Sequence, residues 1–342
     1  MNLSLSASCL SGILDGIGLR KWRAVSIVLL TMLACPGFAQ NEWKPSRNVE
    51  IIVQAGAGGA SDRTARMMQR IIQTGQLVET STTVLNKAGG GGALAYNYIN
   101  QHSGDGHFWL VTSGTLLTSY LSGQSPFPHT DFTPLAILFT EYAAFAVRED
   151  SPIKTGKDLL SRLKGDSPLS IAISPGLGNA NHIAMAMAVK AAGGDVKKLK
   201  IVVFNSSPET MTALLGGHVD VAISPASPML PFITSGKARA IAVSSAQRLG
   251  GALANVPTWK EQGVDAVFGN WRGVLGPKGM SDAQIAYWSR VFARLAASPE
   301  WKDDLDKNLL TPFFMDGKES KKYMDNEYKQ VATIMKDIGL AK

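Results

Sequence analysis

Short runs rich in β-branched residues alternate along the chain with stretches in which apolar residues recur every three to four positions. The run Val49–Ala55 is typical of a strand, and Ser61–Thr74 after it places its apolar residues on one helical face. A glycine-rich turn separates the two segments. Repetition of this unit predicts an α/β architecture with mostly parallel sheets.

The same alternation predicts most of the secondary structure. We expect strands at 82–86, 107–112, 143–148, 169–174, 200–205, 219–224, 238–244 and 270–275, and helices at 156–163, 181–192, 208–216, 229–235, 282–297, 299–309 and 318–340. Helix 282–297 is amphipathic, with Trp288, Phe292 and Leu295 at helical spacing, and we expect it to pack on the N-terminal part of the fold. A chain of 342 residues is long enough for about two domains.

The first 39 residues have the pattern of a signal peptide. A basic cluster at Arg20–Arg23 precedes the uncharged apolar run Ala24–Ala34, which is too short to span a bilayer. Gly37 and Ala39 suit cleavage after Ala39. An alternative is lipidation of Cys35, which the preceding Leu-Ala favours but the following Pro36 does not.

Composition narrows the function further. Both cysteines, Cys9 and Cys35, precede the expected cleavage site, so disulfides and thiolate metal sites are not expected in the mature protein. Loss of Asp15 and the three basic residues lowers the formal net charge from +7 to +5. The basic residues form no dense run, which argues against nucleic-acid binding. We therefore expect an exported protein without a membrane span.

The first glycine-rich turn is a candidate anion site. Residues 55–59 place backbone N–H groups, unobstructed by side chains, at the expected start of a helix. The spacing of Gly56, Gly58 and Ser61 is close to a dinucleotide-binding fingerprint, with Glu79 where a ribose-binding acid could lie. The alternative is a tight turn in which Asp62 complements the helix dipole.

A second turn repeats this arrangement. Gly176 and Gly178 permit close backbone approach after Ser174, and Asn179 or Asn181 is suited to cap the next helix or to reach a ligand. His182 is more often a structural hydrogen-bonding residue in such a place than a ligand-binding one.

Other strand ends carry candidate residues as well. Ligands of open α/β sheets bind beyond the carboxyl ends of the strands, where we expect Ser113, Thr115, Asn205 and Ser224. All four serve equally well as helix caps. Asp220 and Arg272 each have a binding and a structural interpretation, and for both we favour the structural one.

Catalytic and cofactor motifs are missing from the sequence. It contains no Gly-x-Ser-x-Gly, no Gly-x-x-x-x-Gly-Lys-Ser/Thr and no His-x-x-x-His, and its five histidines show no metal-ligand spacing. We therefore expect neither an enzyme nor a bound cofactor or metal.

Taken in order, several short motifs resemble those of the substrate-binding proteins of tripartite tricarboxylate transporters, the Bug-type receptors. The landmarks span nearly the whole mature chain: Gly58–Asp62, Asn86–Gly92, Gly104–Gly106, Asp131–Ala136, Leu214–Asp220, Val256–Thr258, Glu261–Gly263 and Asn270–Gly273. Where many members have a Pro-Phe and a Pro-Gly-Gly in the first loop, this chain has Gln54-Ala55 and Ala57-Gly58-Gly59.

The resemblance implies a periplasmic, monomeric protein with a two-lobed Venus-flytrap fold of type II-like form. Lobe one would comprise 41–142 plus 267–342 and lobe two 143–266, with hinges near 142–145 and 268–270. A carboxylate would bind between the lobes at Ala55–Gly58, Ser113, Thr115 and 176–182, with Asp62 and Asp220 ordering the loops. Many members have a serine where this chain has Asn179 and Asn181, which predicts a ligand with a further acceptor.

The resemblance further implies that the protein delivers a small organic carboxylate, such as a di- or tricarboxylate or an aromatic acid, to membrane permease subunits. Two alternatives stay open: an exported dinucleotide-dependent enzyme, and a soluble sensor that signals to a membrane kinase.

Overall fold

The computed structural model describes residues 42–341, except 166–168, 175 and 205. Residues Trp43–Lys342 form one compact unit of the chain. The predicted signal peptide, its cleavage after Ala39 and the lipidation of Cys35 lie outside the described residues and stay predictions. Among the described helices, none is both long and apolar enough to cross a bilayer.

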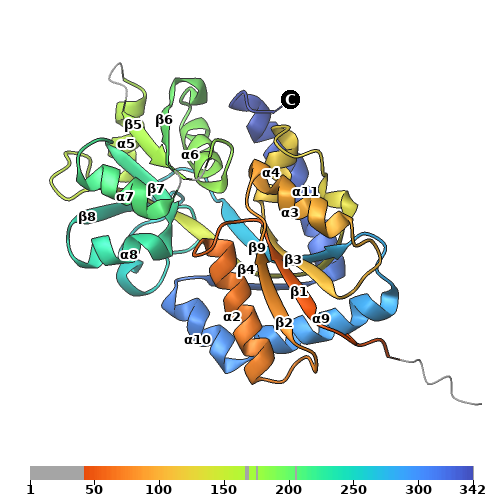
Figure 1. Ribbon diagram of the computed structural model, residues 1–342. Coiled ribbons are helices and arrows are strands. Elements are labelled where there is room, and N and C mark those ends of the chain that lie inside the picture. Colours follow the sequence, from red (N-terminus) through yellow and green to blue (C-terminus); the bar gives the residue numbers. More distant parts are fainter. Residues whose placement is uncertain (1–41, 166–168, 175, 205, 342) are drawn as a thin grey trace, which may run out of the picture. The chain divides into compact units, whose positions relative to one another are not determined.

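Among the described residues, five strands and the first part of a sixth form the first half-sheet. Figure 1 shows its arrangement. In the order β2-β1-β3-β9-β4, with β10 also beside β4, they are β2 (Thr82–Asn86), β1 (Val49–Val53), β3 (Phe108–Ser113), β9 (Gly269–Pro277), β4 (Phe132–Arg148) and β10 (Thr311–Asp316). Strand β1 is parallel to both neighbours, whereas β9 is antiparallel to β3 and β4. Strand β10 is antiparallel to β4 as well.

The second half-sheet begins on the same strand β4. Its residues 143–148 pair with β7 (Val221–Pro225) and β8 (Ala238–Val243), both antiparallel. Strand β5 (Ser170–Ile173) lies between β7 and β6 (Lys200–Val203) and is parallel to both. The expected α/β class is confirmed, but the expectation of mostly parallel sheets is wrong, because β4, β9 and β10 all run antiparallel to their neighbours.

Helices begin where the sequence supplies caps. Capping boxes at Thr155, Ser281 and Asp316 satisfy orphan N–H groups at the first turns of α5, α9 and α11. The helices are α2 (Ala60–Thr74), α3 (Ala93–Asn100), α4 (Thr115–Leu121), α5 (Gly156–Leu163), α6 (Ala180–Ala191), α7 (Ser207–Leu215), α8 (Ala226–Thr234), α9 (Asp282–Ala297), α10 (Pro299–Lys307) and α11 (Gly317–Asp337).

Helix α9 packs on the N-terminal strands, as predicted. Its Trp288 and Phe292 are fully buried and contact Trp109 of β3 with ring centroids 5.8 and 5.3 Å away. Leu295 belongs to the same core. The apolar face seen in the sequence therefore joins a helix from the end of the chain to strands from its beginning.

The sequence pattern missed the first part of β4 together with α4 and β10. The prediction began the strand at Ala143, but one strand of 17 residues runs from Phe132 through both half-sheets. Its pairing changes between Tyr142, which lies opposite Gly269, and Ala143, which lies opposite Pro225. The change of partners lies within 142–145, the segment expected to be a hinge, and its movement stays a prediction.

Ser244, just after β8, joins the two segments that cross between the half-sheets. Its Oγ accepts a hydrogen bond from the N–H of Ala143 (3.0 Å) and donates one to the carbonyl of Phe268 (2.7 Å). Its backbone N–H donates to Ala143 (2.9 Å), and its carbonyl accepts from Phe268 (3.0 Å). One buried serine thus holds both crossing segments together.

Helix α11 connects the two half-sheets at a third place, in addition to the two crossing segments. Val331 and Met335 of α11 form a buried cluster with Ile183 of α6. Lys190 and Asp337 form an ion pair at the edge of this contact. Figure 1 shows the C-terminal end of α11 beside α6.

We predict that Ser244→Ala lowers the free energy of unfolding by about 1–3 kcal/mol, because a buried N–H and a buried carbonyl lose their partner. Urea unfolding followed by circular dichroism measures the change. Ser235→Ala, which removes an exposed hydroxyl bonded only within its own helix turn, is the control and should change little. Equal stability of the Ser244→Ala variant and the wild type would contradict the role given to this side chain.

Candidate functional site

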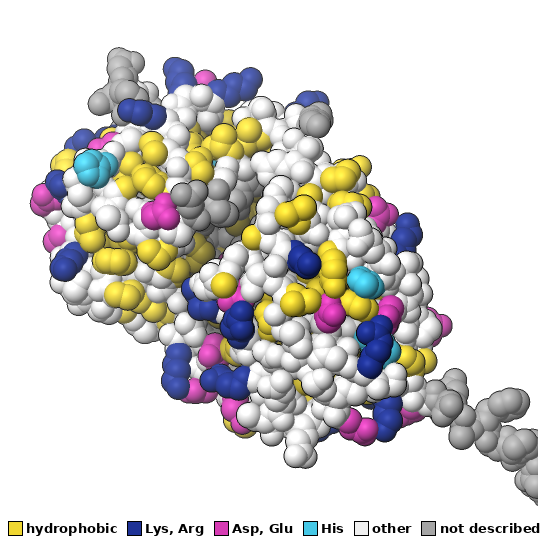
Figure 2. Space-filling model, in the orientation of Figure 1, with side chains coloured by type: hydrophobic (Ala, Val, Ile, Leu, Met, Phe, Trp, Pro, Cys, Tyr) yellow, Lys and Arg dark blue, Asp and Glu magenta, His cyan; other side chains and the backbone are white. Residues whose placement is uncertain are grey.

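A cavity of about 1200 Å³ lies between the two half-sheets, at the ends of strands and the starts of helices from both. Figure 2 shows the surface hollowed in this region. Ten of the predicted site residues line the cavity: Ala55, Gly56, Ala57, Gly58, Ser113, Thr115, Ser174, Gly176, Asn179 and Asn181. Their role in ligand binding stays a prediction.

Five predicted site residues lie outside the cavity lining, and Asn205 lies outside the described residues. The five are Asp62, Gly178, His182, Asp220 and Ser224. The first three support the lining loops from behind, whereas Asp220 and Ser224 do not.

In the first loop, Asp62 fixes the peptide of Gly58. Its Oδ2 accepts a hydrogen bond from the Gly58 N–H (2.8 Å), and Gly58 has a φ of 77°, a conformation that favours glycine. Burial opposes ionisation of Asp62, but hydrogen bonds from Arg66, Gly58 and Asn86 outweigh it and hold its pKa below the ordinary value. The ion pair with Arg66 (3.0 Å) also offsets the negative charge next to an anion site.

The first turn of α2 keeps its backbone donors available. The N–H groups of Ala60 and Ser61 have no acceptor among the described residues, and both residues line the cavity. Gly59, the residue before the helix, provides no side-chain cap. These donors and the helix dipole favour a negatively charged group in the cavity.

In the second loop, as in the first, a glycine N–H donates to the side chain four residues later, but the acceptor here is a histidine ring. The N–H of Gly178, whose φ is 74°, donates to Nδ1 of His182 (3.1 Å). Burial lowers the pKa of His182 to about 4, so its ring is neutral at neutral pH. His182 is therefore a structural residue, as the sequence favoured, and it holds this loop as Asp62 holds the first.

Asn179 caps helix α6, and the amides of Asn179 and Asn181 each use one of their two Nδ2 protons within the loop. Donation of the second proton to a ligand stays a prediction. The Oδ1 of Asn179 accepts from the N–H of His182 (2.9 Å). The Nδ2 groups of Asn179 and Asn181 both donate to the carbonyl of Ser174, at 2.6 and 3.1 Å. The backbone N–H groups of Ala180 and Asn181, in contrast, have no acceptor among the described residues.

At the end of β3, Ser113 serves mainly to orient Thr115. The hydroxyl of Ser113 donates to Oγ1 of Thr115 (3.0 Å) and accepts from the Thr115 N–H (3.3 Å) and from Gln54 (3.4 Å). The hydroxyl proton of Thr115 has no acceptor among the described residues. Thr115 is therefore the one of the pair with a donor left for a ligand.

Three polar residues lie elsewhere than the sequence suggested. Asp220 precedes β7, and its carboxylate accepts from the N–H and hydroxyl of Ser170, which begins β5. This is the opposite end of these strands from the cavity, so Asp220 orders a different loop from the predicted one. Ser224 lies buried within β7 and does not reach the cavity. Glu79, the candidate ribose-binding acid, forms an exposed ion pair with Lys44.

The floor of the cavity contains a buried ion pair that was not among the predicted binding residues. Glu141 of β4 and Arg272 of β9 lie 2.5 Å apart, with side chains 8% and 6% exposed. Asn270, opposite Glu141 in the register, also donates to Glu141 (2.8 Å). A possible signal was that Glu141 is the only acidic residue in the apolar segment 132–148.

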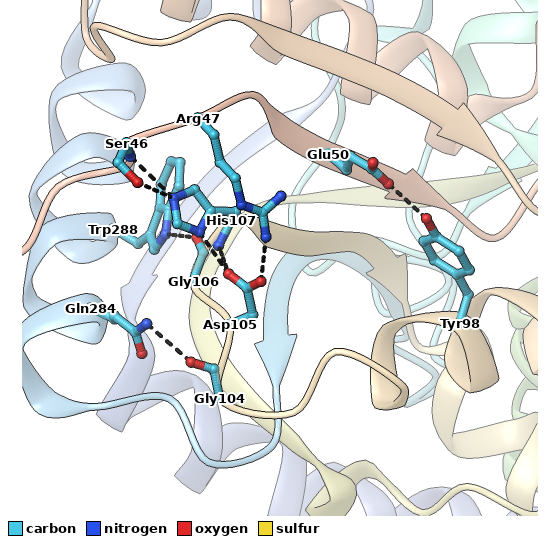
Figure 3. A network of polar contacts seen from close by, with 10 residues as sticks. All are labelled: Ser46, Arg47, Glu50, Tyr98, Gly104, Asp105, Gly106, His107, Gln284 and Trp288. Carbon is cyan, nitrogen blue, oxygen red and sulfur yellow. Dashed lines mark hydrogen bonds and ion pairs between the residues drawn. The ribbon is translucent and has the colours of Figure 1, made fainter.

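A separate polar cluster lies before β3, at the end of that strand away from the cavity (Figure 3). Asp105 accepts from His107 (2.6 Å) and Arg47, and Trp288 donates to the carbonyl of Gly106 (2.8 Å). Hydrogen bonds hold the pKa of Asp105 below its ordinary value despite the opposing effect of burial. The cluster ties the N-terminal segment and α9 to the loop before β3.

Ser46, His107 and Asp105 in this cluster superficially resemble a serine hydrolase triad. The Nε2 of His107, however, accepts a hydrogen bond from the backbone N–H of Ser46 (3.1 Å), which occupies the lone pair that a general base needs. The serine hydroxyl lies farther away, at 3.4 Å. Among the described residues, no group of three or more His, Cys, Asp or Glu side chains is suited to hold a metal ion.

Comparison with known proteins identifies the family. The model of the tripartite tricarboxylate transporter family receptor matches residues 65–340, most of the chain. The protein belongs to this receptor family. The resemblance noted in the sequence motifs is thereby confirmed, and this family binds solutes for transport and is not a family of enzymes.

Relatives cover nearly the whole receptor. A protein of Cupriavidus necator, named "UPF0065 protein in gbd 5'region", is 26% identical over 321 residues, which are 93% of this chain and 96% of that one. A TctC solute binding protein from Polaromonas is 26% identical with a TM-score of 0.70, covering 85% of this chain and 99% of that one. The periplasmic binding protein BugD is 25% identical with a TM-score of 0.74, covering 87% and 99%.

These neighbours confirm the predicted α/β, two-lobed periplasmic-binding-protein fold. Another structure of the same fold, R. palustris Rpa4515 with adipate, has a TM-score of 0.76 at 22% identity and covers 87% of this chain and 99% of that one. The residue boundaries of the two lobes stay a prediction.

We predict that His182 makes stability of the receptor depend on pH. Because its pKa is about 4 in the folded protein and about 6.5 when unfolded, the unfolded chain takes up the proton first as pH falls. Stability is therefore full above pH 6.5 and is lost between about 6.5 and 4, by about 2–3 kcal/mol. His182→Gln, a neutral side chain that retains an acceptor, should remove this component.

Urea unfolding of wild type and variant at pH 7, 6, 5 and 4 tests the prediction through the difference between them. His218→Gln, at an exposed histidine outside the loop, is the control variant. A wild-type advantage over His182→Gln that does not shrink toward pH 4 would count against it.

Proposed function

We propose that the receptor captures a small organic carboxylate in the cavity between its two lobes and delivers it to permease subunits of a tripartite tricarboxylate-type transporter. In this proposal the receptor works in the periplasm as a monomer, after removal of residues 1–39. The carboxylate is the group that the helix starts bind.

The observation that carries the proposal is the pair of helix starts at the cavity. Helices α2 and α6 come from different half-sheets, and each presents two N–H groups without an acceptor among the described residues. Each start follows a glycine whose N–H is taken up by a side chain four residues later, so the loop is held in place before any ligand binds. Such donors favour an anion and bear no charge of their own.

Known ligands of proteins with this fold are compatible with the proposal. Rpa4515 was solved with adipate, and MatC, at 21% identity and a TM-score of 0.69, with bound malate. Both ligands are small carboxylates. They support the capacity of this fold to bind such ligands.

Closure of the cavity is the proposed mechanism. A volume of about 1200 Å³ exceeds the roughly 300–1000 Å³ of typical ligand pockets, which suits an open state. A ligand that contacts both helix starts binds the closed state more tightly than the open one. Its differential affinity then shifts the population toward closure.

We predict that Gly56→Ala and Gly176→Ala each weaken carboxylate binding at least tenfold without lowering the melting temperature of the ligand-free protein. A Cβ at either glycine meets nothing within 4 Å, and neither has a left-handed φ, so the methyl group is tolerated but occupies ligand space. Gly250→Ala is the matched control, because it too meets nothing and lies outside the cavity lining.

The measurement has two stages on protein stripped of bound ligand by unfolding and refolding. A melting-temperature screen against mono-, di- and tricarboxylates finds the ligand, since 100 times the dissociation constant adds about 2.7 kcal/mol of stability. Titration calorimetry then compares the variants with wild type. Full affinity in both glycine variants, or no stabilisation by any carboxylate, would overturn the proposal.

A further inference from the structure

The carboxylate of Glu141 on the cavity floor is only partly used. Its Oε1 accepts from Nη2 of Arg272 (2.5 Å) and from Nδ2 of Asn270 (2.8 Å). Its Oε2 has no hydrogen-bond partner among the described residues. Unlike the unpaired side-chain atoms that are fully buried, it retains some exposed surface. Since a carboxylate accepts about four hydrogen bonds, Glu141 retains capacity on the side of the cavity that it lines.

Two neighbouring amides differ in what they can offer a ligand. Because Nδ2 of Asn270 donates to Glu141, its Oδ1 points the other way, and this oxygen is fully buried without a partner among the described residues, so it is not reachable from the cavity. The reversed amide would set Oδ1 against the carboxylate, so the orientation is fixed by Glu141. Across the cavity, Asn181 uses one of its two Nδ2 protons on Ser174, which leaves Oδ1 and the second amide proton without a partner among the described residues.

The charges around the cavity are balanced. Among the described lining residues, Arg63 and Arg272 are cationic and Glu141 and Asp304 are anionic. A tricarboxylate would bring three negative charges to a surface with no excess of positive side chains. A ligand with one carboxylate at the helix starts and a positive donor at the floor suits both the charges and the acceptors.

We propose that the ligand carries a protonated amino group in addition to its carboxylate, and that Glu141 binds this group through Oε2. This inference rests on the proposed function and narrows its ligand class to amino acids in the broad sense. An ammonium group has three donors and a full charge, whereas a hydroxyl group offers one neutral donor. Hydrogen bonds to a charged partner are the stronger kind.

Matched ligand series test the inference on the wild-type protein. Each series keeps one carbon skeleton and changes one substituent: propionate, lactate and alanine; succinate, malate and aspartate; glutarate, 2-hydroxyglutarate and glutamate; butyrate, 4-hydroxybutyrate and 4-aminobutyrate. In the series that binds best, titration calorimetry at pH 7.5 should give the amino acid at least a tenfold advantage over both other members.

Glu141→Gln should remove most of this advantage while the plain acid keeps its affinity to within a few-fold. Asp304→Asn is the matched control, because it also removes one negative charge from the cavity lining but has no contact with Glu141. The amino preference should survive in that variant. Because the wild-type comparison needs no variant, the test stands even if Glu141→Gln folds poorly.

The outcomes separate this inference from the proposed function. If plain acids bind but the amino member binds no better than the plain or hydroxy acid, the inference is overturned and the proposed function stands. An equal loss for all members of the series in Glu141→Gln would also overturn it, because Glu141 would then act through the fold alone. If no member of any series binds but another carboxylate of the melting-temperature screen does, the inference is overturned and the proposed function stands. If no carboxylate binds at all, both are contradicted.

Discussion

A single strand that belongs to two half-sheets constrains the rest of this structure. Because β4 changes partners between Tyr142 and Ala143, the polypeptide has no flexible linker at that crossing, and the cavity opens directly above a hydrogen-bonded ladder. Ser244 then binds this crossing to the one at Phe268. A continuous hydrogen-bonded ladder therefore forms the cavity floor and holds its side chains, including Glu141.

The two glycine loops of the cavity are each held by a side chain, but the two side chains differ in their chemistry. A loop that offers backbone N–H groups to a ligand needs a fixed shape, and in both halves a side chain four residues after a glycine supplies it. In the first half that side chain is an ionised aspartate, balanced by Arg66. In the second it is a neutral histidine. Neither side chain therefore adds an unpaired charge to the loop that lines the cavity.

Much of this arrangement could be predicted from local sequence. The two glycine turns, the helices after them and the amphipathic face of α9 follow from patterns within about 20 residues, and the structure places them as expected. The mixed strand directions and the full length of β4 depend on pairings between distant segments, such as Glu141 with Asn270, which one sequence does not display. For the same reason Asp220, one residue before β7, was wrongly assigned to the ligand loops, whereas Glu141 was missed.

The contact of α11 with α6 gives the receptor a third support besides its two crossing strands. Two strands joined side by side by one serine resist separation but still permit both bending and twisting of one lobe against the other. A helix end packed on Ile183 and tied by Lys190 to Asp337 lies to one side of that junction and opposes the twist. In the proposed closure, the lobes would therefore rotate about a single line that passes through the strand junction and the helix contact.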